Sequence, residues 1–155
     1  MTVLDKETLT LRKRTIKQGT NSIEIEVRDN KAVGKSNTGG QERPISVDLG
    51  GPLFADGATG LSISVLPLKE GYTTTFRNFD LQRQKTKLLR LAVSGSESVT
   101  VPAGTFDAFK VEITSADGGM DKMTVWVAKD LRKPVKVSAV LGQMGGATAT
   151  SELVQ

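Results

Sequence analysis

The stretch from residue 99 to residue 113 constrains the fold of this chain more than any other. At its centre, Pro102-Ala103-Gly104 has turn chemistry, because proline presets φ at the first turn position and glycine accepts a positive φ. Apolar residues alternate on both sides of the turn, as in a β-hairpin: Val99 and Val101 before it, and Phe109, Val111 and Ile113 after it. The alternation changes parity around Phe106–Ala108, which predicts a β-bulge there.

Turn residues divide the rest of the chain into further short strands. In the clearest strand, Ile23, Ile25 and Val27 alternate with Glu24, Glu26 and Arg28, which predicts one buried and one solvated face. The preceding strand is expected over Thr8–Lys17, with Arg12 and Arg14 on the face opposite Leu9 and Leu11. The carboxylates of one strand are expected to pair with cations of the other.

The segment Leu53–Leu66 has both helical and strand spacing, and we predict a short helix there, ended by Pro67. A bend is expected at Gly95-Ser96, and turns or loops at 116–119, 130–134 and 142–146, with a last strand over 147–153. The sequence therefore predicts a mainly β fold. About ten strands form a single antiparallel meander curled into a barrel or half-barrel, with at most one short helix. All 155 residues are expected to form one domain.

The composition excludes several kinds of chemistry. The chain has no Cys and no His, so there is no disulfide, no His/Cys zinc site, no Ser-His-Asp triad and no His general base. It also lacks a Walker loop, a Gly-x-Gly-x-x-Gly fingerprint and a Gly-x-Ser-x-Gly elbow, and we expect no cofactor. One Trp, one Tyr and five Phe argue against a base-stacking platform, so nucleic acid is not the expected partner.

Two features concern location. No apolar run approaches the length of a membrane-spanning helix. Met1–Asp5 is no signal peptide, so either the protein is cytoplasmic, or an export signal or an upstream domain is missing from this sequence.

A resemblance favours export. Residues 99–111, with their VPAGTF core, resemble a motif of uncharacterised exported bacterial β-proteins, in which a strand with a Trp, a turn and a further strand follow. Here Trp126-Val127-Ala128-Lys129-Asp130 and Pro134–Val137 match that order, so that the resemblance covers Leu66–Val137. Some of those proteins are similar to periplasmic lipoprotein-carrier half-barrels, which hold acyl chains against a concave sheet. The resemblance implies a periplasmic or secreted β-domain and a lipid or other apolar ligand, and it carries no catalytic residues.

Four cations are the candidate ligand-binding or surface-binding residues: Arg83, Lys85, Lys87 and Arg90. On a strand, the first three share one face at a spacing of about 7 Å, where they can meet phosphates or anionic lipid heads. The alternative is a solvated strand face with edge-protecting lysines.

Two glycine-containing segments are candidate sites. Asp117-Gly118-Gly119-Met120-Asp121 superficially resembles a calcium loop, but it lacks further ligands and a closing Glu. Gly142–Gly146 is either an apolar-tipped loop at a cavity mouth or a plain hairpin loop. We therefore predict no metal site and no catalytic residue.

The expected function is that of a non-catalytic exported β-domain that binds an apolar or amphipathic ligand or a partner protein. Two alternatives stay open. One is a small hydrolase that acts on an ester or a polymer without His or Cys, and the other is a structural accessory domain of a secreted multidomain protein.

Overall fold

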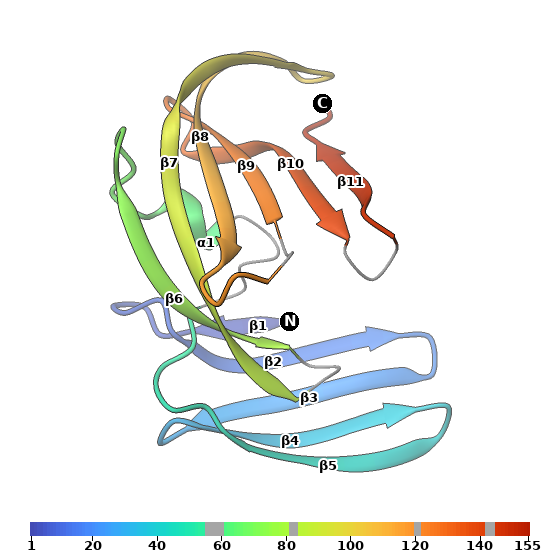
Figure 1. Ribbon diagram of the computed structural model, residues 1–155. Coiled ribbons are helices and arrows are strands. Elements are labelled where there is room, and N and C mark those ends of the chain that lie inside the picture. Colours follow the sequence, from blue (N-terminus) through green and yellow to red (C-terminus); the bar gives the residue numbers. More distant parts are fainter. Residues whose placement is uncertain (55–60, 81–83, 120–121, 142–144) are drawn as a thin grey trace. The chain divides into compact units, whose positions relative to one another are not determined.

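The computed structural model describes residues 1–54, 61–80, 84–119, 122–141 and 145–155 (Figure 1). Most of them lie in β-strands, and the only helix in this part of the chain is a single turn, so the mainly β prediction is confirmed. The strands form two antiparallel sheets, and within each sheet they follow one another in chain order. The expected single meander is thus divided into two meanders.

The first sheet has five strands: β1 (Thr2–Leu4), β2 (Leu11–Gln18), β3 (Asn21–Arg28), β4 (Lys31–Thr38) and β5 (Gln41–Asp48). The second sheet has six strands: β6 (Thr73–Asp80), β7 (Lys85–Val101), β8 (Gly104–Ser115), β9 (Lys122–Ala128), β10 (Lys133–Leu141) and β11 (Ala147–Glu152). The helix α1 (Leu61–Ser64) lies within the segment for which a short helix was predicted, of which residues 55–60 are outside the described part.

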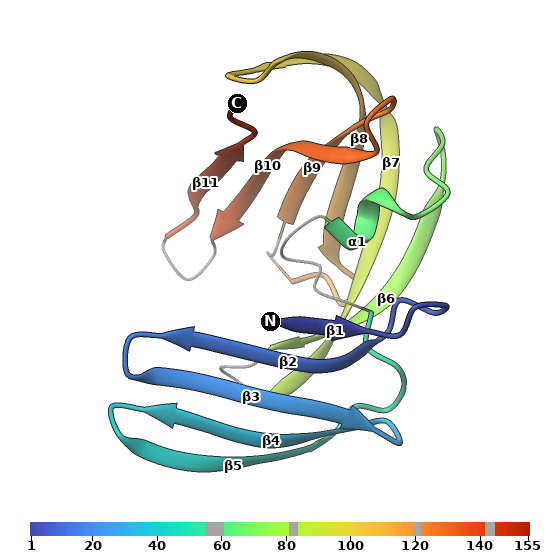
Figure 2. The same ribbon diagram turned by 180° about the vertical axis from the view of Figure 1, so that it is seen from behind.

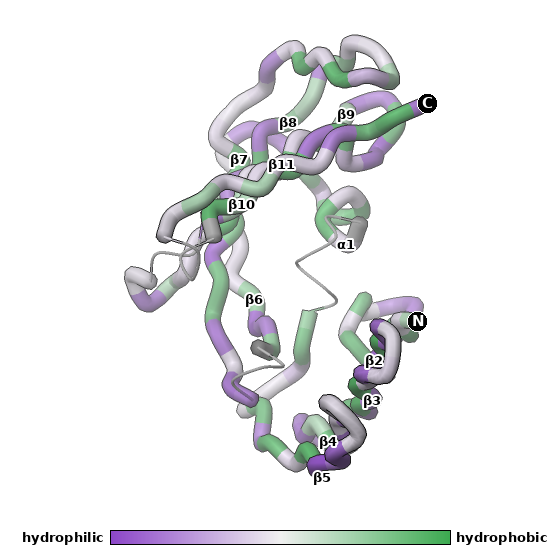
Figure 3. The backbone as a smooth tube through the Cα atoms, turned by 90° about the vertical axis from the view of Figure 1, so that its right-hand side faces the viewer, coloured by the Kyte–Doolittle hydropathy of each residue, from purple (hydrophilic) through white to green (hydrophobic). Residues whose placement is uncertain are grey.

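The chain forms two compact units, which we describe separately. Residues 1–55 and 77–87 form the first unit, and residues 56–76 and 88–155 form the second. Neither unit is continuous in the sequence, and β6 and β7 each contribute residues to both. Figure 3 shows hydrophobic and hydrophilic residues alternating along β7, the pattern of a strand with two unlike faces.

The first unit has a core on one face of its sheet. Its buried side chains are Leu11, Ile25, Val27, Ala32, Ile45, Leu49, Leu53 and Phe79. The strand that was expected to begin at Thr8 begins at Leu11, because Asp5–Thr10 forms a loop in which Leu9 has a φ of 57°. The register places Arg14 opposite Ile25 and Lys13 opposite Glu26, so Arg14 lies on the apolar side of the sheet, whereas the exposed Arg12 pairs with Asp5. The predicted face of Arg14 is therefore wrong, because the hairpin register and not the leucine pattern sets it.

The hairpin at residues 99–113 is present, with Pro102 and Ala103 as its two turn residues and Val101 paired with Gly104. The bulge lies elsewhere than predicted. Pairing is continuous through Phe106–Ala108, and the extra residue is Ser94 on β7, between the pairs Val93–Val111 and Gly95–Lys110. One extra residue reverses the side-chain parity beyond it. Beyond the bulge, the apolar residues of β7 lie on the other face of the sheet. The apolar residues of β8 change parity at the same level, so that the apolar residues of both strands again share a face.

Beyond the bulge, β7 and β8 arch over toward the C-terminal segment (Figures 1 and 2). The Ala103 N–H donates to the Leu153 carbonyl at 3.1 Å, and the Leu153 N–H donates to the Val135 carbonyl at 2.9 Å. The arch encloses a small core of buried residues: Val99, Val101, Ala108, Ala128 and Val135. The predicted turn is thus also a tertiary contact that fastens the end of the chain.

The opposite face of this sheet is apolar across four strands. One row aligns Val93, Val111, Val125 and Val137 on β7–β10. A parallel row aligns Leu91, Ile113, Met123 and Ala139. The helix α1 packs against β10, and it lies behind the sheet in Figure 1 and in front of it in Figure 2. Ile63 of α1 and Leu68 after it are buried.

Candidate functional site

The four cations proposed from the sequence do not share one face. Arg83 is outside the described residues, while Lys85 and Arg90 are exposed and Lys87 is half-buried on β7. By the alternation of a strand, Lys85 and Lys87 lie on the same side as the buried Leu89, and Arg90 lies on the other. The structure therefore places at most the two lysines together as a surface.

The predicted turn residues, Pro102-Ala103-Gly104, have a structural role in the hairpin. Gly104 has a φ of 135°, which an L-residue with a side chain rarely adopts. Ala103 is half-buried beside the core under the arch, and its N–H is bonded to Leu153. Pro102-Ala103-Gly104 therefore positions the tip of the hairpin.

A polar row centred on Trp126 crosses the second sheet, and sequence reasoning did not find it. Lys110 on β8 and Lys136 on β10 are the direct neighbours of Trp126 on β9. Their ammonium groups lie 6.0 Å and 5.8 Å from the centre of the indole ring, within cation–π range. The indole N–H donates to Glu97 at 2.5 Å. Spacing along the chain gives no signal for this row, because only strand register brings residues 97, 110, 126 and 136 together.

Carboxylates balance the charge of this row. Lys136 lies 2.8 Å from Glu152 on β11, and Lys110 lies 3.9 Å from Glu97. Two lysines and two glutamates therefore surround one Trp, with no excess charge for an anion to meet. The row joins β7 to β11 and acts as a cross-strand clamp of the second sheet.

The solvated face of the first sheet carries ion pairs between β2 and β3, as expected, but their cation is Lys13 and not Arg12 or Arg14. Lys13 lies 2.6 Å from Glu24 and 3.6 Å from Glu26. The hydrogen bond and the charge of Lys13 lower the pKa of Glu24, and those of Glu24 raise the pKa of Lys13. An open hollow of about 450 Å³ lies on the same face, lined by Glu24, Glu26, Arg28, Val33, Gly34 and Lys35. Because Glu24, Arg28 and Lys35 each already have an ion-pair partner, the hollow has the character of a solvated sheet face.

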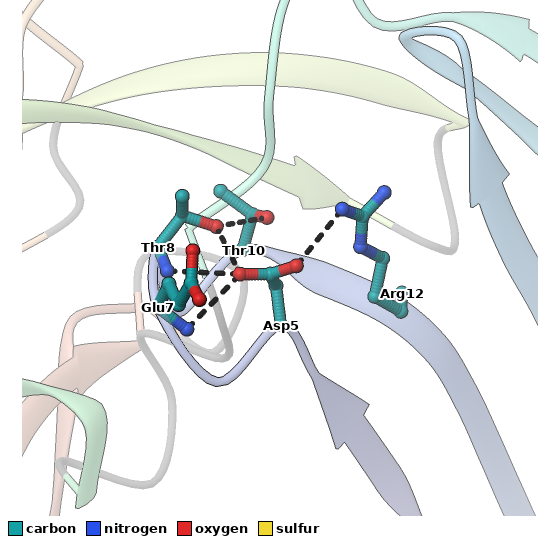
Figure 4. Close-up of polar contacts among 5 residues, drawn as sticks. All are labelled: Asp5, Glu7, Thr8, Thr10 and Arg12. Carbon is teal, nitrogen blue, oxygen red and sulfur yellow. Dashed lines mark hydrogen bonds and ion pairs between the residues drawn. The ribbon is translucent and has the colours of Figure 1, made fainter.

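The loop after β1 is built around Asp5 (Figure 4). Its Oδ1 accepts hydrogen bonds from the N–H groups of Glu7 and Thr8 and from the Thr8 hydroxyl, and its Oδ2 pairs with Arg12 at 2.9 Å. These donors, led by the Thr8 N–H, hold the pKa of Asp5 well below its usual range. These hydrogen bonds make Asp5 the cap of the loop, and a carboxylate of such low basicity is a poor general base.

Asp117 has the same local role in its turn. Asp117 accepts hydrogen bonds from the Gly119 N–H and the Ser115 hydroxyl, while Met120 and Asp121 lie outside the described residues. Of the loop at 142–146, only Gly145 and Gly146 are described, both with a positive φ.

In the described ranges, no three Asp or Glu side chains are grouped so that they can hold a metal ion. No helix within these ranges is long and apolar enough to span a bilayer.

Comparison with known proteins finds one similar solved structure and one matching family model. A search of curated proteins finds no match. Among solved structures, the chain is similar to the hypothetical lipoprotein YmcC from Escherichia coli (K12), with 14% sequence identity and a TM-score of 0.40. That match covers 86% of this chain and 78% of the other. A family model matches residues 2–152, and the chain therefore belongs to the family described as "Protein of unknown function (DUF3108)".

Proposed function

We propose that this chain is a non-catalytic exported β-domain, and that the apolar face of the second unit's sheet binds an apolar or amphipathic ligand. The observation that carries the proposal is the extent of that face. Leu91, Val111 and Val125 are fully buried on three neighbouring strands. The described segment that lies against the sheet contributes one helical turn, with Ile63 and Leu68 as its buried apolar side chains.

A ligand can take the place of the segment that covers the apolar face, which consists of α1 and the residues up to Leu68. A single helical turn has almost no stability of its own, so it stays in place through the apolar side chains that it buries. Arg132 adds a long hydrogen bond of 3.4 Å from its guanidinium to the Leu66 carbonyl. An acyl chain buries apolar surface equally well, at about 0.8 kcal/mol for each CH₂ group. A long chain can therefore replace the contacts of Ile63 and Leu68.

The experiment is native mass spectrometry of protein freshly purified from a bacterial host, followed by titration with a fluorescent fatty acid. We expect a co-purified lipid and saturable binding of the probe. Val125→Thr places a hydroxyl on the apolar face and should weaken probe binding several-fold, whereas Val33→Thr, the same change at an exposed position of β4, should not. A chain that carries no lipid and does not bind the probe would contradict the proposal.

The cations near β7 call for a separate test, which uses vesicles. Because Lys87 and Arg90 lie on opposite sides of the strand, we expect little sedimentation with anionic vesicles at physiological salt. Four cations acting together would each contribute about 1 kcal/mol. Strong binding that salt releases, and that is lost when Arg83, Lys85, Lys87 and Arg90 are changed to Gln, would instead make these residues a membrane-binding face.

A further inference from the structure

The last strand, β11, has a free edge. It is the terminal strand of the second sheet and pairs with β10 over six residues, from Ala147–Leu141 to Glu152–Lys136. All six of its side chains are exposed. On its other side, every second residue presents its backbone N–H and C=O groups away from β10, with no further strand of the described chain beside them.

The two edges of the first sheet are protected in ways that β11 is not. The edge strand β1 has only three residues. The edge strand β5 carries Glu42, Arg43 and Pro44 in succession, and charge and proline are common devices against further strand pairing. In β11, by contrast, residues 147–151 read Ala-Thr-Ala-Thr-Ser, with small side chains, β-branched threonines and no charge.

We propose that β11 pairs with β11 of a second copy of this chain, so that the second sheets of two chains join edge to edge. The charges favour this occupant. Residues 147–151 bring no like charges together, and the one carboxylate of the strand, Glu152, is already 2.8 Å from Lys136 of its own chain. Every strand pair of this sheet is antiparallel, and a two-fold axis normal to the sheet continues that pattern.

The sequence of β11 suits this symmetry. A two-fold axis that passes midway between Ala149 and Ala149 of the second copy places Thr148 opposite Thr150 and Ala147 opposite Ser151, so that side chains of similar size meet on each face. Thr–Thr pairs across antiparallel strands are favourable. Five short residues per chain bury far less than the roughly 800 Å² per partner of a stable interface. The dimer should therefore be weak and depend on concentration.

The test is sedimentation equilibrium of the full chain from micromolar to millimolar concentration. We expect the average mass to rise toward that of two chains. The double variant Ala149→Lys/Thr150→Lys places like charges at the centre of the joint and should weaken association at least tenfold, with partial recovery at high salt. The control Gln41→Lys/Ser46→Lys adds the same charge to the exposed edge strand β5 and should associate as the unmodified chain does.

Thermal denaturation shows whether each variant is folded. If the β11 variant has a lowered midpoint, the exchange rates of the β11 amides in the unmodified chain replace it, and they should slow as concentration rises. An unmodified chain that stays monomeric at millimolar concentration would overturn the proposal, as would equal association of the two double variants. Neither result depends on whether the apolar face binds a ligand.

Discussion

At the scale of single residues, two glycines are required for different physical reasons. Gly104 has a φ of 135°, and a Cβ added there would meet only Phe106, at an ordinary 3.8 Å. Gly34 has no unusual φ, but a Cβ added there would collide with the backbone carbonyl of Glu24 on the neighbouring strand. The first position thus requires glycine for its dihedral angle, and the second for the closeness of two strands.

For Gly104, we expect Gly104→Val to lower the free energy of unfolding by about 1 kcal/mol or more, through backbone strain alone. Chemical denaturation measures the change. Ala103→Ser, in the same turn, is the control and should be nearly neutral. An unchanged stability of Gly104→Val would mean that the turn adopts other dihedral angles in solution.

For Gly34, we expect Gly34→Ala to cost more than Gly19→Ala. A Cβ at residue 19 meets nothing within 4 Å, so Gly19→Ala lowers the free energy of unfolding only through the positive φ of 59°, by about 1 kcal/mol. Gly34→Ala must push β3 and β4 apart, which resembles overpacking of a core and lowers the free energy of unfolding by about 1–3 kcal/mol or more. Denaturation midpoints of the two variants decide the order, and the reverse order would show that the strands yield easily at this point.

For Asp5, the hydrogen bonds of the loop predict a pH dependence. The folded-state pKa lies below the unfolded value of about 3.9, so the carboxylate stabilises the fold above that pH and loses its effect as the pH falls further. The stability difference between the unmodified chain and Asp5→Asn should therefore be constant near neutral pH and shrink below about pH 4. Thermal midpoints between neutral and acid pH measure it, and a difference that grows on acidification would contradict this account.

At the scale of elements, the bulge at Ser94 decides how the central hairpin packs. It lets Val93 and Val99 face opposite sides of the sheet, although their numbers have the same parity. Val93 belongs to the apolar row across the sheet, whereas Val99 lies in the small core under the arch. Because of this single bulge, β7 contributes apolar side chains to two separate cores on opposite faces of the sheet.

Deletion of Ser94 should be far more harmful than its substitution. Without the extra residue, Val99 and Val101 turn to the wrong face, and we expect loss of the arch and of the Ala103–Leu153 hydrogen bond. Ser94→Ala removes only a long hydrogen bond of 3.4 Å to the Lys110 carbonyl and should be close to neutral. Amide exchange at Ala103 reports the arch, and full protection in the deletion variant would show that the bulge can move.

At the scale of the whole molecule, the two units share the chain in an interleaved way. The first unit needs residues 77–87, which come after the first part of the second unit. Phe79 is buried in the core of the first unit, and the Arg77 carbonyl accepts the Phe54 N–H. That residues 1–155 fold as one domain stays a prediction, and this interleaving supports it.

A fragment of residues 1–55 should therefore fail to fold cooperatively, although it contains all of β1–β5. In the full chain, Phe79→Ala should destabilise the protein by about 3–5 kcal/mol, because it removes a buried aromatic ring from the first core. Denaturation followed by circular dichroism tests both. A fragment that unfolds in one sharp transition would show that the five-stranded sheet is independent of residues 77–87.

The sequence by itself determined the local structure. Alternation of apolar residues placed the strands, and Pro102 and Gly104 placed the central turn, because side-chain period and backbone dihedral preference are properties of a few neighbouring residues. Only the tertiary structure decided the rest. The division into two sheets depends on which strands pair, and the face of Arg14, the bulge at Ser94 and the row around Trp126 depend on the register of those pairs. Register is set by pairs of residues far apart in the chain, and no local pattern encodes it.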